Sequence, residues 1–413
     1  MRRHKPDFIL LFVVFCLVAF GLVMVYSSSM VWAVQVVNTS PAHFFKLQLI
    51  YAIIGIVGMF AIMRLRYEGI KKLARPIYLF TLLSLILVLV PGIGHKENGV
   101  RRWIGPISLH FQPSELALVG ILFYMAFMYD KHQDGVRNFW RGVFPPLLML
   151  GFQFLLVMKQ PDMGTAMLLL LSGLSIMFAA GIRKRHMALI ALIFTPIIAA
   201  FAWFEAYRNA RLLVFLHAWD PKYTNKGGYQ LQQSLIAIYH GGLFGQGLGR
   251  GIQPFLYLPI PYADFIFAIV IEELGLVGAI ALLGLFSALI WRGVRISQHL
   301  PNRFSSLLVL GITSMIGIGT LINVGAVTGL LPITGIPLPF ISYGGTALIV
   351  KLWAMGVVLA LSRYTSDRLS EEQGKRSAST VVSLTPPIKT RNTGRNSAKS
   401  ARRSRSTEVF TKK

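Results

Sequence analysis

The feature that most constrains this chain is a series of long apolar runs that continues from residue 8 to residue 362. A run of about 17–25 apolar residues crosses the hydrocarbon core of a bilayer as a helix. Hydrophobic residues make up 54% of the 413 positions and charged residues only 14%, which is unlike a soluble domain. The sequence therefore predicts an all-α, polytopic integral membrane protein. The ten predicted transmembrane helices lie at residues 8–26, 47–63, 77–90, 113–129, 143–157, 163–182, 187–204, 265–291, 305–327 and 346–362.

The basic residues predict how these helices are oriented. Lys and Arg near helix ends stay in the cytoplasm, and most of the 41 basic residues fall on one side if the N-terminus is inside. The first apolar run is too long for a signal peptide, so we interpret it as a retained anchor. With ten spans both termini are cytoplasmic. The large loop 206–263, between helices 7 and 8, is then extracytoplasmic.

Composition divides the chain into a membrane domain at 1–363, which includes loop 206–263, and a basic tail at 364–413. The tail is rich in Ser, Thr, Lys and Arg and has almost no apolar face, which predicts disorder. Because most of the net charge of +25 follows the topology rule, we expect no nucleic-acid partner. Anionic lipid headgroups suit the tail, and a docking site for a cytoplasmic protein is the alternative. Cys16, the only cysteine, lies in the first apolar run, so intrachain disulfides are excluded.

Three acidic residues stand at or within an apolar run, where a charged side chain is costly and usually has a function. Asp264 lies at the mouth of the run 265–291, which makes it the candidate catalytic residue. The alternative is a helix N-cap, since a carboxylate before Phe265 could accept from free amides. Glu272 and Glu273 lie deeper, and we expect them to face a polar cavity or a partner such as Lys351 in the last predicted helix.

The outward connections carry the remaining candidate site residues. Irregular backbone at membrane depth lines protein or a watery cavity, so we expect these loops to converge on one outward-facing cavity. The candidate substrate-binding cations are Arg101, Arg102, Lys159 and Arg250, and ordinary headgroup contact is the alternative for each. Two acidic residues complete the set. Glu115 complements the positive end of its helix or binds substrate, and Asp162 turns its loop or binds near a sugar.

Glycines are concentrated at residues 241–251 within the large loop. Their spacing does not match a dinucleotide fingerprint, and no strand-turn-helix context surrounds them. We interpret this stretch as a tight or flexible loop whose backbone approaches a lipid-linked ligand.

Four segments occur in an order and spacing that are informative together. They are Gly99-Val100-Arg101-Arg102-Trp103-Ile104 with Phe111-Gln112-Pro113-Ser114-Glu115-Leu116-Ala117; Gln160-Pro161-Asp162-Met163-Gly164-Thr165-Ala166; Asp264-Phe265-Ile266-Phe267 with Glu272-Glu273-Leu274-Gly275; and Pro337-Leu338-Pro339-Phe340-Ile341-Ser342-Tyr343-Gly344-Gly345. Over residues 8–363 the chain resembles the SEDS family (shape, elongation, division and sporulation). The stretch 90–94 and the basic tail favour the division type over the elongation type.

The resemblance implies a ten-helix glycosyltransferase in the bacterial cytoplasmic membrane, at the division septum. Such a protein polymerises lipid II into β-1,4 glycan strands at the outer face, beside a class B penicillin-binding protein and other divisome membrane proteins. The family's essential aspartate falls on Asp264. The resemblance also implies Mg²⁺ or Mn²⁺, although the sequence has no cluster with recognisable ligand spacing, so no metal-ligating residue is predicted.

The chain departs from the family pattern at three places. Tyr262 and Ala263 stand where the family usually has His-Thr, and this change could alter acceptor contacts. Leu118 stands where the family usually has a lysine one turn past the Gln-Pro-Ser-Glu motif. Lys351 is unexpected for the family.

The chemistry implied by the resemblance needs a single base. A sugar on a polyprenyl diphosphate already carries a good leaving group, whereas glycoside hydrolysis takes two carboxylates. We expect Asp264 to deprotonate the acceptor 4-hydroxyl, with inversion at the donor sugar, and we expect cations to stabilise the departing diphosphate. Two other functions remain open, namely a lipid II flippase and a non-catalytic divisome scaffold.

Overall fold

The computed structural model describes residues 4–365, except 98–99, 106–110, 205, 221, 223–227 and 255–256. Most of the basic tail, from residue 366 on, lies outside the described residues, and its predicted disorder and lipid contacts stay predictions. Within residues 4–365 the chain is mainly helical. The helices are α1 (Phe8–Gln35), α2 (His43–Met63), α3 (Tyr67–Leu87), α4 (Pro113–Lys131), η1 (Phe139–Val143, a π-helix), α5 (Phe144–Met158), α6 (Met163–Ala179), α7 (Lys184–Phe204), α8 (Ala206–Leu216), α10 (Tyr229–Gly241), α11 (Ile266–His299), α12 (Arg303–Val327) and α13 (Gly345–Ser362).

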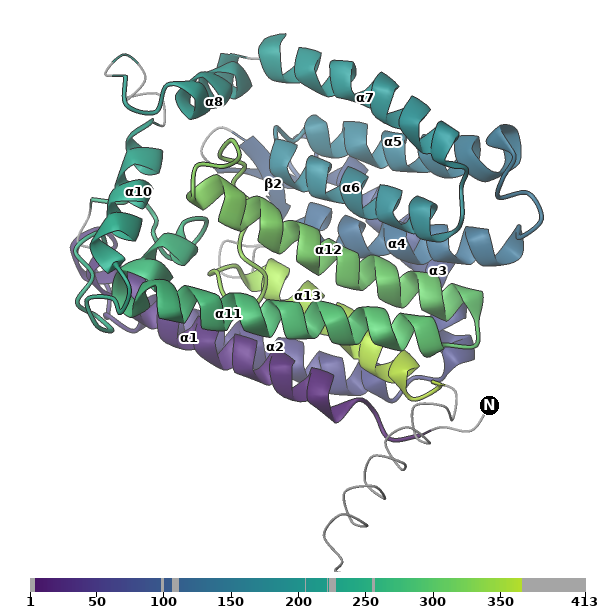
Figure 1. Ribbon diagram of the computed structural model, residues 1–413, viewed down its shortest axis with the longest axis horizontal. Coiled ribbons are helices and arrows are strands. Elements are labelled where there is room, and N and C mark those ends of the chain that lie inside the picture. Colours follow the sequence, from purple (N-terminus) through teal and green to yellow (C-terminus); the bar gives the residue numbers. More distant parts are fainter. Residues whose placement is uncertain are drawn as a thin grey trace, which may run out of the picture. The chain divides into compact units, whose positions relative to one another are not determined.

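The long helices pack side by side, and consecutive ones run in opposite directions (Figure 1). In this packing α13 lies against α2, α11 against α12 and α1, and α4 against α3, α6 and α12. Each of the ten predicted spans falls on one of these helices. In the described part of the chain, six helices are long and apolar enough to cross a membrane, by length and composition: Phe8–Gln35, His43–Met63, Phe139–Met158, Ile266–His299, Arg303–Val327 and Gly345–Ser362. The number of ten spans and the sidedness of the loops stay predictions.

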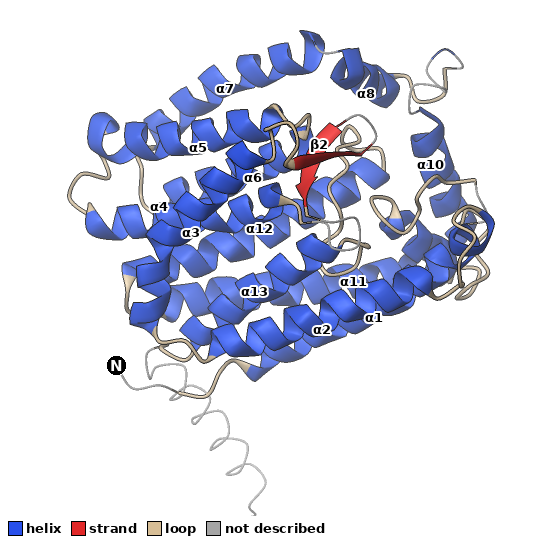
Figure 2. Ribbon diagram, turned by 180° about the vertical axis from the view of Figure 1, so that it is seen from behind, coloured by secondary structure: helices blue, strands red, loops and turns tan. Residues whose placement is uncertain are grey.

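The prediction of an all-α fold misses one small sheet. Strands β1 (Gly94–Glu97) and β2 (Val100–Ile104) form an antiparallel hairpin, in which Lys96 faces Arg101. Figure 2 shows the strands at the end of the bundle to which α8 and α10 also belong. The two helices α8 and α10 lie in the predicted large loop, so this loop is partly helical.

Helix α11 is broken at Gly275, whose φ of 70° and ψ of −172° are not helical. The break leaves backbone groups without helical partners, and the glycine-rich stretch pairs them. The amides of Gln246 and Gly247 donate to the carbonyls of Glu272 and Glu273 at 2.9 Å each. In return, the carbonyls of residues 242 and 243 accept from the amides of residues 276 and 277, at 3.0 and 3.2 Å.

The glycines of this loop are therefore required by the broken helix. A Cβ atom at Gly245 would lie 2.2 Å from the carbonyl oxygen of Glu273, and Gly245 has a φ of +78°. Only glycine adopts this conformation without strain and leaves room for so close a backbone contact. This backbone approaches α11, and its approach to a lipid-linked ligand stays a prediction.

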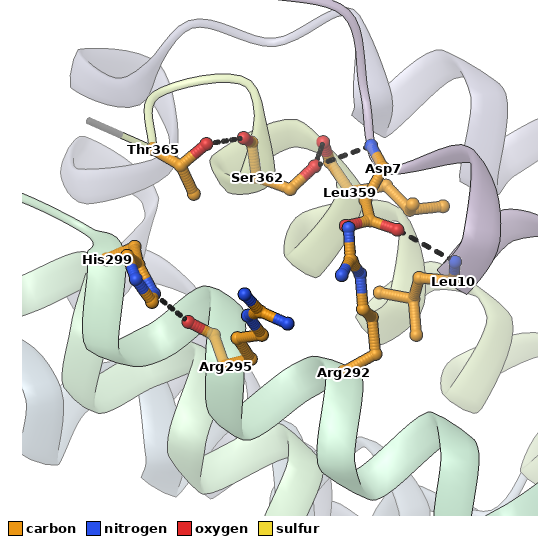
Figure 3. Close-up of polar contacts among 8 residues, drawn as sticks. All are labelled: Asp7, Leu10, Arg292, Arg295, His299, Leu359, Ser362 and Thr365. Carbon is orange, nitrogen blue, oxygen red and sulfur yellow. Dashed lines mark hydrogen bonds and ion pairs between the residues drawn. The ribbon is translucent and has the colours of Figure 1, made fainter. Parts of the chain in front are cut away.

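At the end of the bundle opposite Asp264, polar contacts near the N-terminus join α1, α11 and α13 (Figure 3). Asp7 caps α1 by accepting from the amide of Leu10 at 2.9 Å, and its Oδ2 lies 2.7 Å from Nε of Arg292 in α11. Its amide donates to Oγ of Ser362 in α13 at 3.1 Å. Three elements that are distant in the sequence thus meet at one residue. We name the two ends of the bundle the Asp7 end and the Asp264 end.

Candidate active site

Asp264 lies in the turn that precedes α11, and other elements hold its backbone. The side-chain amide of Asn323, on α12, donates to the carbonyls of Asp264 at 2.8 Å and Ile336 at 2.7 Å. Two residues earlier, the carbonyl of Tyr262 accepts from the amide of Tyr343 at 2.9 Å. Residue 265 is the cap of α11, which has no side-chain cap. The N-cap alternative for Asp264 is therefore wrong, and its carboxylate is not used to begin the helix.

The departure at Tyr262 has a packing role. Its ring lies 4.4 Å from that of Phe44 and 5.5 Å from that of Tyr343, measured between centroids. Burial raises the pKa of Tyr262 to about 12, so its phenol stays neutral near pH 7. Tyr262 thus fixes the turn that carries Asp264 and adds no charge to it.

Two arginines and a second carboxylate act electrostatically on the Asp264 side chain. A Cβ atom at Gly335 would lie 3.4 Å from Asp264 Oδ2 and 3.9 Å from Arg211 Nη1, so both groups border the same glycine. Burial raises the pKa of Asp264, and the carboxylate of Asp162 raises it further, whereas Arg211 and Arg102 lower it. With these opposing effects combined, the pKa of Asp264 is above the ordinary value for aspartate. A raised pKa brings a carboxylate closer to the range in which it accepts a proton efficiently near neutral pH.

Arg102 and Asp162 are both held by backbone contacts. Arg102, on strand β2, donates from Nε to the carbonyl of Gln160 at 2.9 Å and from Nη2 to the carbonyl of Pro161. Asp162 is the N-cap of α6, where its Oδ1 accepts from the amide of Thr165 at 3.2 Å. Its Oδ2 accepts from Nε2 of Gln112 at 3.1 Å. Of the two alternatives for Asp162, the structure therefore shows the structural one, because Asp162 caps α6. Its charge also raises the pKa of Asp264.

Glu115 and Lys351 form a buried ion pair. Lys351 Nζ lies 3.0 Å from Glu115 Oε2, and their side chains are 4% and 5% exposed. We expected Glu272 and Glu273 to face a polar cavity or a partner such as Lys351, and Lys351 is not that partner. Helix α13 carries Lys351 toward α4, so it meets the carboxylate at the start of that helix.

Glu272 and Glu273 are buried where α11 breaks, and each has local partners. Glu272 Oε1 accepts from the amides of Ile252 at 2.9 Å and Gln253 at 3.1 Å. Glu273 accepts from Oγ of Ser27 at 2.6 and 2.7 Å. Both carboxylates thus hold the glycine-rich loop against α1 and α11, and we assign them a structural pairing role.

The other predicted cations lie elsewhere on the surface of the Asp264 end. Arg101 is half-buried in β2, and Lys159 and Arg250 are exposed. None of the three is among the charged groups that shift the pKa of Asp264. Of the four predicted cations, the structure places Arg102 within electrostatic reach of Asp264.

Sequence reasoning missed Arg211, the larger of the two arginine effects on Asp264. It lies on α8, and its Nη1 donates to the carbonyl of Ile333 at 3.1 Å. The loop 206–263 contains several basic residues, and no spacing distinguishes Arg211 from them. The signal that could have found it is the amphipathic pattern of residues 206–216, which form α8.

The donors at this site do not fit a resident metal ion. No group of three or more His, Cys, Asp or Glu side chains with suitable placement occurs among the described residues. Both oxygens of Asp162 already accept hydrogen bonds, and arginines accompany Asp264. The Mg²⁺ or Mn²⁺ implied by the family resemblance therefore has no step in the chemistry proposed below.

Comparison with known families now identifies the chain. The family described as "Cell cycle protein", which comprises FtsW, RodA and SpoVE, matches residues 8–367. The chain belongs to this family. It is therefore a multi-pass membrane protein, in agreement with its apolar helices.

Individual relatives agree along nearly their whole length. The chain is 40% identical to "Stage V sporulation protein E" of Bacillus subtilis over 364 residues, 88% of this chain and 99% of that protein. It is equally identical to a "Probable peptidoglycan glycosyltransferase FtsW" of Geobacter sp., over 88% of this chain and 98% of that protein.

Two solved structures are similar. One belongs to a peptidoglycan synthase complex, with a TM-score of 0.72, 28% identity and coverage of 87% of this chain and 98% of the other. The other is RodA of Thermus thermophilus, with a TM-score of 0.65, 28% identity and coverage of 87% and 98%.

Proposed function

We propose that this protein is a peptidoglycan glycosyltransferase that polymerises lipid II into β-1,4 glycan strands. Relatives that carry the name peptidoglycan glycosyltransferase match the chain at 40% identity over nearly their whole length. The single structural observation that carries the proposal is the Asp264 carboxylate, which caps no helix, has a raised pKa and borders the same glycine as Arg211.

In the proposed reaction, Asp264 accepts the proton of the 4-hydroxyl of the acceptor's N-acetylglucosamine. The oxygen attacks the anomeric carbon of the donor's N-acetylmuramic acid, and a new C–O bond forms as the bond to the polyprenyl diphosphate breaks. The electron pair leaves with the diphosphate. Attack opposite an α-linked leaving group gives the β-1,4 product by inversion.

The two arginines supply the charge that this step needs. Negative charge grows on the diphosphate as the bond breaks, and preorganised cations stabilise such charge strongly in a buried site. Arg102 comes from the β-hairpin and Arg211 from α8, so two separate elements of the bundle end supply the guanidinium groups. We assign the diphosphate to these two groups.

The proposal includes location and partners. The Asp264 end faces the outside of the bacterial cytoplasmic membrane, and both termini face the cytoplasm, with ten spans between them. Similarity to a chain of a peptidoglycan synthase complex supports a partner that cross-links the strands, a class B penicillin-binding protein. We place the enzyme at the division septum with other divisome membrane proteins.

The test uses purified full-length protein with lipid II in detergent, with and without the cognate class B penicillin-binding protein. We expect glycan strands from the wild type and none from Asp264→Asn. Asp220→Asn, at an exposed position of the same large loop, is the matched control and should behave as wild type. Strand synthesis that persists in Asp264→Asn contradicts the mechanism. Lipid II translocation in vesicles, with no strands made under any condition, would instead support a flippase.

A further inference from the structure

The buried Lys351–Glu115 pair is a charged contact that the proposed reaction does not use. Both side chains are almost fully buried. The two residues are 236 positions apart in the sequence, and their contact joins α13 to α4. A buried ion pair is weak evidence for stability, because desolvation of the two charges offsets their attraction. Its best-attested benefit is that it specifies one relative position of the two elements.

On the α4 side, Glu115 lies close to Gln112, which contacts the second carboxylate of the site, Asp162. Glu115 lies in the first turn of α4, three residues past Gln112. Nε2 of Gln112 donates to Asp162 Oδ2 at 3.1 Å and to Oγ of Ser114 at 3.0 Å. The start of α4 thus forms a wall of the site that includes Asp162, and through the 160–162 turn it includes Arg102.

On the α13 side, Lys351 lies in the helix that follows the turn packed against Asp264. The amide of Tyr343, two residues before α13, donates to the carbonyl of Tyr262. Oγ1 of Thr346, in the first turn of α13, accepts from the amide of Gln112 at 3.3 Å. The start of α13 therefore touches both the turn that carries Asp264 and the residue that holds Asp162.

We propose that Lys351 is a positioning residue, which sets the distance between Asp264 and the wall formed by Asp162 and Arg102 by fixing α13 against α4. The inference rests on the proposed glycosyltransferase activity. Lys351 is needed for this activity but does not contact the substrate. Misplacement of about 1 Å in a catalytic constellation lowers a rate by about a hundredfold. We therefore expect loss of the pair to lower kcat and to leave KM nearly unchanged.

Leu118 allows a test that separates position from charge neutralisation. It lies three residues after Glu115 on α4 and is buried, and side chains three apart on a helix are neighbours. A lysine at 118 can therefore neutralise Glu115 without joining α4 to α13. The set consists of Lys351→Met, Glu115→Gln with Lys351→Met, and Leu118→Lys with Lys351→Met. Lys46→Met, at an exposed lysine near the start of α2 at the same bundle end, is the control.

For each variant we measure folding by size-exclusion profile and thermal stability, and kcat and KM of strand synthesis. Lys351→Met alone leaves a buried charge without a partner, so it should be unstable. The two double variants should recover stability, because no uncompensated charge remains, yet kcat should stay about a hundredfold low. Lys351→Arg, which keeps a cation on α13, should retain more activity than either double variant. Double variants that are stable and have wild-type kcat would overturn the inference and leave the proposed function intact.

A geometric measurement does not depend on activity. Gln112→Cys and Thr346→Cys, in a Cys16→Ser background, place two thiols where α4 and α13 touch, and dibromobimane joins thiols that are close. We expect efficient cross-linking in the otherwise native chain and reduced cross-linking in both Lys351→Met double variants. Equal cross-linking in all of them contradicts the positioning role, even if the wild type makes no strands.

Discussion

The two ends of the bundle treat their buried charges differently. At the Asp7 end, charges meet opposite charges or backbone groups. Asp7 pairs with Arg292, and Asp130 accepts from Lys71 at 2.6 Å and from the amide of Phe304 at 3.2 Å. The Asp264 end also holds such a pair, Lys351 with Glu115. It differs at Asp264, on which the charges of two arginines and of Asp162 act in opposite directions.

In the part of the chain that the structure describes, buried side-chain atoms without a hydrogen-bond partner are more frequent at the Asp264 end, although Nδ1 of His186, at the start of α7, is one at the Asp7 end. Several side-chain atoms at the Asp264 end have no hydrogen-bond partner among the described residues, including Oδ1 of Asn323, Oγ1 of Thr334 and both amide atoms of Gln160. Native proteins pair most of their buried polar groups, and exceptions concentrate at functional sites. The comparison teaches that the Asp7 end only holds helices together, whereas the Asp264 end, beside its own pair, also keeps polar groups available for chemistry.

The largest expected effect is on the stability of the Asp7 end. Asp7→Asn retains a good N-cap for α1 but leaves Arg292 buried without its counterion, which costs about 3–5 kcal/mol. The activity of the molecules that remain folded should be unchanged. Thermal unfolding in detergent, with strand synthesis normalised to folded protein, measures both quantities.

Lys71→Met is the matched control, because it breaks a pair whose lysine side chain is 35% exposed. Exposed pairs contribute about 0–1 kcal/mol. If Asp7→Asn were as mild as Lys71→Met, or if it lowered activity per folded molecule, the division of roles between the two ends would be wrong.

The second effect is on catalysis at the Asp264 end. Arg211→Ala removes a cation beside Asp264, and loss of one preorganised charge-stabilising group lowers kcat by about 10²–10³, or about 2.7–4 kcal/mol of barrier. The same loss is expected for Arg102→Ala. Arg250→Ala, an exposed arginine of the same large loop, is the control and should retain wild-type kcat. Steady-state synthesis of glycan strands from lipid II measures all three, and equal rates would remove Arg211 from the site.

The smallest effect is the stability gained by neutralising Asp264. Its pKa in the folded protein is above the ordinary value for aspartate, so the folded state binds this proton more tightly than the unfolded state does. This contribution is fully present below the unfolded pKa and is lost as the pH rises through the folded pKa. Ionised Asp264 therefore destabilises the protein near neutral pH.

Asp264→Asn should accordingly be slightly more stable than the wild type near neutral pH, by about 1.4 kcal/mol for each unit by which the pKa is raised. The difference should shrink toward the acidic range. Wild-type activity should rise with pH through the same raised pKa, because only the ionised form accepts a proton. Unfolding temperature and activity as functions of pH measure these effects, and a less stable Asp264→Asn at neutral pH would contradict the assignment.

Local pattern was sufficient for the ten apolar helices, although it missed α8 and α10, and it was sufficient to select Asp264 as the catalytic candidate. Hydropathy marked all ten apolar segments, because the length of an apolar run is a property of neighbouring residues. Asp264 was identified since a carboxylate at the edge of such a run is rare and costly. The β-hairpin was missed because its strands are short, and the break in α11 was missed because a single glycine in a helical pattern does not reveal its φ.

What the sequence by itself determined is therefore the helical membrane character, the family resemblance and the catalytic candidate. Only the tertiary structure decided which charges meet: Arg211 rather than Arg250 beside Asp264, and Glu115 rather than Glu272 or Glu273 beside Lys351. The physical reason is that an electrostatic interaction depends on distance in space. That distance is set by the packing of helices hundreds of residues apart, and no local pattern records it.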